Sequence, residues 1–120
     1  MPRARRISRR FGGPGSLASK AAFYTDRSPI HGRGLFASRR IRRGEHIGTF
    51  EGARTKSDGP HVLWVWRDDG QVEGIRGRNA LRYLNHATAP NAEFEGPDLY
   101  ALRDIAPGHE ITIHYGEDWD

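Results

Sequence analysis

The stretch "EITIHYGEDWD" (110–120) closes the chain and alternates polar with apolar residues. Such alternation predicts a β-strand over 110–115, because successive side chains of a strand point to opposite faces of its sheet. Tyr115 then shares a face with Ile111 and Ile113 and points into an apolar interior. Two interpretations follow: a core tyrosine with a hydrogen-bonded hydroxyl, or a hydroxyl that performs chemistry in a buried channel.

The composition predicts one small, turn-rich domain that is mostly β. The chain has 120 residues, with 15 glycines and 7 prolines, and its strand-like runs are short. It has no cysteine, which excludes disulfides, thiolate zinc sites and a cysteine nucleophile. Its six histidines lack a zinc-ligand spacing, so no metal is predicted. With no run of about 18 apolar residues and no secretory signal, we expect a cytoplasmic protein without a membrane segment.

Charge divides the chain into a basic arm and a mildly acidic domain. Residues 1–20 carry five arginines, one lysine and no acid, or +6. The other hundred residues carry 13 basic and 15 acidic side chains, or −2. We therefore predict a flexible, Gly/Ser-rich basic tail over 1–22 and a folded domain over 23–120. The tail is either a solvated segment or a nucleic-acid contact that binds phosphates through its arginines.

The remaining pattern predicts short strands joined by turns. Asp68-Asp69-Gly70 reads as a hairpin turn, and 79–86 has the spacing of one or two helical turns. The echo of "RRIRRGEHI" (39–47) in "RDIAPGHEI" (103–111) predicts one turn used twice, with Gly44 and Gly108 at positive φ. The predicted strands are 46–52, 61–67, 71–75, 99–105 and 110–115, with a short strand ending 31–38 and a loop over 53–60.

Four motifs in order carry a family resemblance. They are "HGRGLFA" (31–37), "FEG" (50–52), "NALRYLNHATAPN" (79–91) and "GHEITIHYG" (108–116). Asn-His-x-x-x-Pro-Asn followed about twenty residues later by Glu-Ile-Thr-x-x-Tyr-Gly is the specific pair. The pattern resembles the SET-domain protein-lysine methyltransferases over roughly 23–119. It is most similar to the minimal viral and bacterial members, which lack cysteine-rich zinc modules.

The resemblance implies a fold, a cofactor and a reaction. The fold is a β-clip of short sheets with one short helix and a C-terminal pseudoknot. The cofactor is S-adenosylmethionine, converted to S-adenosylhomocysteine. The substrate is an exposed lysine of a basic protein such as a histone, a histone-like protein or a ribosomal protein, in the cytoplasm or, for chromatin, in the nucleus or nucleoid. The alternatives are a non-catalytic SET-like module that binds a peptide or nucleic acid, and an Arg-tailed nucleic-acid-binding domain, which the acidic fold disfavours.

Site residues carry over from the matching motif positions. Tyr115 takes the catalytic position, where its hydroxyl aligns the reacting atoms. Asn85 could otherwise be a helix C-cap and His86 a structural histidine. Asn91 would fix the knot, and His61 stands where some relatives have a cofactor-contacting tyrosine. Trp119 would stack on adenine or cover a core edge. The cofactor-binding set is Gly32, Arg33, Gly34, Leu35, Arg82, Asn85, His86, Tyr115 and Trp119.

Three apolar positions match the substrate lysine channel of the family: Phe50, Phe94 and Ile113. Phe50 departs from the tyrosine that many relatives have, so it keeps the channel wall and loses a hydroxyl. Phe94 and Ile113 occupy the positions that limit the number of methyl groups, and neither has a hydroxyl. We therefore expect methylation beyond the first methyl group. We also expect a homodimer or the bound substrate to close the channel, because little chain follows Tyr115.

Overall fold

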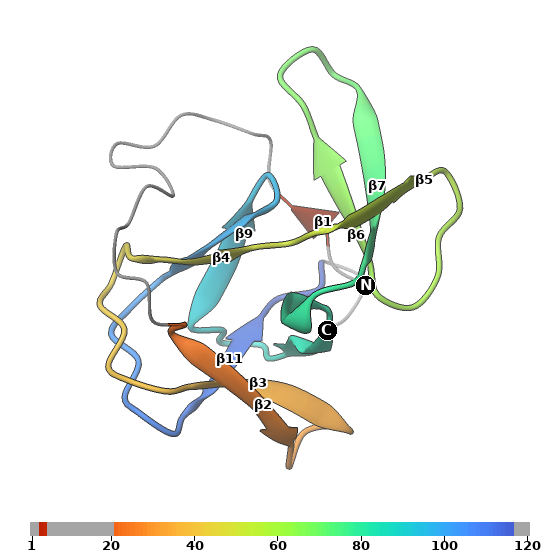
Figure 1. The fold of residues 1–120 in the computed structure, drawn as a ribbon. Helices are drawn as coiled ribbons and strands as arrows, with labels where there is room; N and C mark the ends of the chain where they lie inside the picture. The colour runs from red at the N-terminus through yellow and green to blue at the C-terminus, as the bar shows by residue number, and fades with distance from the viewer. Residues whose placement is uncertain (1–2, 5–20, 117–120) are drawn as a thin grey trace.

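The computed structural model describes Arg3–Ala4 and residues 21–116, and it is built from three small β-sheets (Figure 1). The first sheet has the order β1-β6-β7-β5, the second β4-β10-β9, and the third β2-β3-β11-β8. The bounds are β1 Arg3–Ala4, β2 Phe23–Arg27, β3 Arg33–Ala37, β4 His46–Thr49, β5 Gly52–Thr55, β6 Val62–Trp66, β7 Val72–Gly77, the 3-10 turn η1 Ala80–Tyr83, β8 Asn85–His86, β9 Ala92–Glu95, β10 Asp98–Ala101 and β11 Glu110–Ile113. The mainly β prediction is confirmed.

Strand β11 is the element that joins the separated motifs in space. It pairs antiparallel with β3, with Ile111 opposite Leu35, and parallel with β8, with Thr112 opposite Asn85. The loop after β8 adds side-chain bonds, because the Asn91 amide donates to the carbonyl of Glu110 over 2.9 Å and accepts the N–H of Thr112 over 2.8 Å. Asn91 therefore ties this loop to β11. The pseudoknot and the β-clip stay predictions.

The structure changes several predicted boundaries. The predicted strand 46–52 is two strands, since β4 ends at Thr49 and β5 begins at Gly52. Residues 53–55, expected in a loop, belong to β5, which pairs with β7. Strand β11 ends at Ile113, so Tyr115 lies two residues beyond it. The hairpin at Gly70 and the positive φ angles of Gly44 (84°) and Gly108 (82°) are confirmed.

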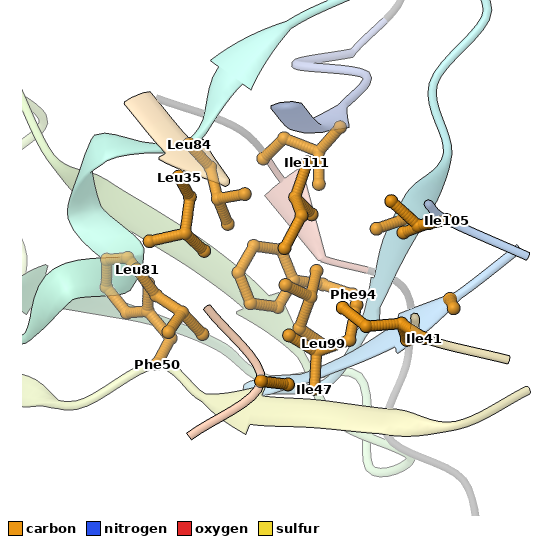
Figure 2. Close-up of a cluster of buried hydrophobic side chains, with 14 of the residues drawn as sticks. Leu35, Ile41, Ile47, Phe50, Leu81, Leu84, Phe94, Leu99, Ile105 and Ile111 are labelled. Carbon is orange, nitrogen blue, oxygen red and sulfur yellow. The ribbon is translucent and has the colours of Figure 1, made fainter. Parts of the chain in front are cut away.

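One hydrophobic core lies between the sheets (Figure 2). Leu35 of β3, Leu84 beside η1 and Ile111 of β11 are fully buried in it. Phe50 and Phe94 meet edge to face, with ring centroids 5.8 Å apart. Tyr115 packs against this cluster, so it faces inward as expected although it lies beyond the end of β11. The core therefore fixes β3, β8 and β11 beneath the surface that carries the candidate site.

Candidate functional site

A cleft of about 560 Å³ lies where β3, η1, β8 and the end of β11 meet. Six predicted cofactor residues border it, together with His61, whose position also suggested a cofactor contact. The lining is Ile30, His31, Gly32, Arg33, Pro60, His61, Arg82, Tyr83, Leu84, Asn85, His86 and Tyr115. Tertiary structure thus brings three of the four separated motifs to one surface. Trp119, the remaining aromatic candidate, lies outside the described residues.

Tyr115 is held at the cleft by both its backbone and its hydroxyl. Its phenol donates to the carbonyl oxygen of Leu84 over 2.6 Å, and its backbone N–H donates to Nδ1 of His86 over 2.9 Å. Burial, and secondarily the negative charge of Glu110, raise the pKa of the phenol above its ordinary value. The hydroxyl is therefore a neutral, oriented dipole over the whole physiological pH range.

The loop between β2 and β3 forms one wall, and polar side chains beneath it hold it in place. The buried amide of Asn85 donates to the carbonyls of His31 and Arg33 and to the carboxylate of Glu110, over 2.9–3.1 Å. Glu110 also accepts the hydroxyl of Ser28 over 2.8 Å. Asn85 is thus a brace for the loop between β2 and β3, and Glu110 anchors the brace from β11.

Gly34 sits directly against this brace. A Cβ built at Gly34 would lie 2.3 Å from Oε2 of Glu110 and 3.0 Å from Cβ of Ser28. A side chain at this position would therefore displace the carboxylate. Gly34 and the fully buried Leu35 do not border the cleft, whereas Gly32, at φ 49°, does. Glycine at 34 is required by close packing beneath the loop.

The opposite wall is built around Arg82. Its guanidinium donates to the carbonyls of Arg78 and Asn79 over 2.7 and 2.9 Å and lies 4.3 Å from the centroid of the Tyr83 ring. Nδ1–H of His61 donates to the carbonyl of Arg82 over 2.8 Å. His61 has φ 63°, a left-handed conformation that is uncommon outside glycine and costs free energy. These bonds hold the His61 ring at the rim of the cleft.

A second hollow of about 340 Å³ is lined by two of the three predicted channel residues, Phe94 and Ile113. Ile113 precedes Tyr115 by two residues, so neighbouring positions of one segment border the two hollows. Phe50 borders neither hollow and packs beneath on the ring of Phe94. All three channel candidates are almost completely buried.

Sequence reasoning missed several residues of the site. The alternation of 110–115 places Glu110 on the face opposite Ile111 and gives it no role at the site, although its position in Glu-Ile-Thr belongs to the family motif. Tyr83 and Leu84 lie inside the Asn-His motif segment, and Leu84 contributes through its carbonyl, which no side-chain pattern reveals. Ile30 and Pro60 carry no signal of this kind. Among the described residues, no group of His, Asp or Glu could hold a metal ion, and no helix is long and apolar enough to cross a membrane.

A family model described as the SET domain matches residues 32–116, which include every described residue of β3, β8 and β11. The chain belongs to the SET-domain family. Human histone-lysine N-methyltransferase 2B is 34% identical over 118 residues, covering 81% of this chain and 4% of the relative. The SET domain therefore spans a small part of the length of the curated relatives that it matches.

Solved structures share the fold of this SET domain. The methyltransferase domain of human PR domain-containing protein 2 superposes with a TM-score of 0.65 at 23% identity, covering 86% of this chain and 83% of that one. A chain of the Chaetomium thermophilum Polycomb Repressive Complex 2, bound to S-adenosylmethionine, gives a TM-score of 0.66 at 22% identity, covering 81% of this chain and 15% of that one. At these identities the likeness establishes the fold.

Proposed function

We propose that this SET domain transfers methyl groups from S-adenosylmethionine to the ε-amine of a protein lysine. The observation that carries the proposal is Tyr115, whose hydroxyl stands at the cleft on a half-buried side chain and donates its proton to Leu84. Relatives named histone-lysine N-methyltransferases and a SET neighbour bound to S-adenosylmethionine support it. The substrate we propose is a lysine in a basic protein of the histone or histone-like type, reached in the cytoplasm or at chromatin.

The cleft fits a nucleoside-sized cofactor. Its volume of about 560 Å³ lies within the usual range of ligand sites, roughly 300–1,000 Å³. Backbone groups of Gly32 and Arg33 would meet the amino-acid end of the cofactor, where the guanidinium of Arg33 complements a carboxylate. The rings of His61 and Tyr83 at the opposite wall supply flat surfaces for a purine. Asn85 would act beneath them, through the loop that it holds.

When bound, S-adenosylmethionine supplies a methyl group whose carbon bonds to the lysine nitrogen while the carbon–sulfur electron pair stays on sulfur, leaving S-adenosylhomocysteine and a proton for water. The residues of this chain orient the amine. The hydrogen bond from the Tyr115 phenol to Leu84 fixes the direction of the hydroxyl, and its oxygen would accept an N–H from the amine. His86 fixes the Tyr115 backbone, so the oxygen cannot move away. Such a preoriented dipole acts without reorganisation in the transition state.

The apolar channel would admit the lysine side chain and favour the neutral form of its amine. An ammonium with an ordinary pKa near 10.4 cannot attack, and burial between apolar walls favours its neutral form. Phe94 and Ile113 line the hollow with carbon, and Phe50 packs behind the ring of Phe94, so none of the three offers a hydroxyl that could hold a water there. We therefore propose products beyond monomethyl-lysine. Mass spectrometry of a substrate peptide after long incubation tests this, and an accumulation of monomethyl product alone contradicts it.

The activity is tested with radiolabelled S-adenosylmethionine and a basic-protein substrate. We expect Tyr115→Phe to lower transfer by at least about 100-fold, as loss of an oriented transition-state dipole does. Tyr24→Phe is the matched control, because Tyr24 lies on the exposed face of β2, stacked on Phe36. Equal transfer by wild type and Tyr115→Phe would remove Tyr115 from the mechanism.

Two observations favour a second candidate, a SET-like module that binds a peptide or nucleic acid without turnover. Phe50 lacks the hydroxyl that many relatives place in the lysine channel, and the basic residues of 1–20 suit a polyanion. Calorimetry with S-adenosylmethionine separates the two candidates. Methyl transfer requires the cofactor to bind, and absence of any heat of binding with a folded protein would favour the binding module.

A further inference from the structure

The edge of strand β6 carries a feature that the proposed reaction does not use. In the order β1-β6-β7-β5, β6 pairs with β7 on one side, and on the other the described chain offers only β1. The pairing with β1 is parallel, with Arg3 opposite Trp64 and Ala4 opposite Val65. An open strand edge presents unpaired N–H and C=O groups, which bind any extended segment by adding a strand.

The added strand lies between two sheets. Besides pairing with β6, β1 lies against β9 of the second sheet (Figure 1). Strand β9 carries Phe94, a proposed wall of the lysine channel, and Glu93 of the same strand lines the hollow that Phe94 and Ile113 border. A segment bound at the β6 edge therefore runs beside the expected entrance for a substrate lysine.

The surroundings of this edge suit a basic segment. On β9, the strand that β1 lies against, the half-buried Glu93 and Glu95 share the face away from the core. Carboxylates attract guanidinium and ammonium side chains. Trp64 and Trp66 of β6 border a separate hollow with Asp58 and Val72, over the β6–β7 pair. We call Glu93 and Glu95 the basic-segment site.

We propose that the basic arm of this chain, residues 1–20, occupies the basic-segment site as a tethered competitor of the substrate. The arm carries +6 and no acid, whereas residues 21–120 carry −2. Its Arg3–Ala4 already forms the added strand. A short tether gives an effective concentration in the millimolar range, so even weak docking competes with a free peptide. The competition with substrate rests on the proposed function, whereas the docking does not.

The test uses the full chain in three forms: wild type, an arm variant (Arg3→Gln, Arg5→Gln, Arg6→Gln) and a control that removes the same charge from exposed positions (Arg27→Gln, Arg42→Gln, Arg43→Gln). The probe is a fluorescein-labelled synthetic peptide with the sequence of residues 1–12, followed by anisotropy. We expect the arm variant to bind this peptide at least about threefold more tightly than the other two forms, because its own arm no longer competes. Amides of β6 should also exchange faster in the arm variant, since they lose their partner strand.

A fourth form, Glu93→Gln with Glu95→Gln in the arm variant, should bind the peptide at least about threefold more weakly than the arm variant. With a lysine peptide as substrate, the arm variant should show a lower KM by a similar factor and an unchanged kcat. Absence of methyl transfer in every form refutes the proposed function and leaves the docking result standing. Equal peptide affinity in wild type, arm variant and control, with unchanged β6 exchange, overturns the inference. That outcome is also the one expected if the arm serves nucleic acid instead.

Discussion

Substitution of Gly34 by alanine probes the brace beneath the loop between β2 and β3. The new Cβ would stand 2.3 Å from Oε2 of Glu110, so the carboxylate must move away from both Ser28 and Asn85. Hydrogen bonds to a charged group contribute about 1.5–3 kcal/mol each, and overpacking costs about 1–3 kcal/mol. Allowing for partial relaxation of the flexible Glu110 side chain, we expect a loss of about 2–4 kcal/mol in the free energy of unfolding, measured by urea denaturation.

The same change should weaken binding of S-adenosylmethionine in calorimetry by about tenfold or more, since one wall of the cleft shifts. Gly59→Ala is the control, because a Cβ there meets only the end of the Arg76 side chain at 3.9 Å. In a double-mutant cycle, Glu110→Ala should remove most of the added cost of Gly34→Ala, leaving the contact with Ser28. A cost equal to that of Gly59→Ala, or full additivity with Glu110→Ala, would refute the close-packing argument.

Three further predictions concern stability. The hydrogen bond from Arg39 holds the pKa of Glu45 in the folded protein below its ordinary value of 4.5. The Glu45 carboxylate therefore stabilises the fold fully above pH 4.5. This stabilisation is lost as the pH falls through the lowered pKa of the folded protein. In urea titrations, the free energy of unfolding of the wild type should exceed that of Glu45→Gln by about 0.5–1 kcal/mol at pH 7, and the two should be equal near pH 2. Gly52→Ala should lower the free energy of unfolding by about 3 kcal/mol or more, because its Cβ would lie 1.7 Å from the backbone oxygen of Arg76 on β7. A melting temperature equal to that of the wild type would contradict this. Phe94→Ala should lower the free energy of unfolding by about 3–5 kcal/mol, because it leaves a cavity in the core. A change below about 1 kcal/mol would mean that the ring is not packed as described.

The local sequence pattern predicted those elements whose sequence signals lie within a few residues of one another. The hairpin of β6 and β7 follows from two β-type runs around Asp-Asp-Gly, and the two turns at Gly44 and Gly108 follow from a shared spacing that needs positive φ. Boundaries were less predictable, since β5 carries no alternating apolar signal. Residues 53–55 are a strand only because β7 offers them a partner. Strand β9 was not predicted, because its apolar signal consists of only two buried residues, Ala92 and Phe94, which alternate with two outward-facing glutamates.

The sequence by itself determined the family, the mostly β class and most of the residues at the cleft, because the motif spacing specifies them without reference to coordinates. Only the tertiary structure decided how they act. Strand β11 pairs with β3 and β8 at once, and this brings Glu110 beneath Asn85 and the Tyr115 hydroxyl onto the carbonyl of Leu84. The contacts of Glu110 with Asn85 and with Ser28 join residues 25 and 82 positions apart in the chain. A backbone carbonyl that accepts a phenol, a carboxylate packed under a glycine and a strand edge that pairs with a distant segment have no side-chain signature, so they become visible only when the chain folds.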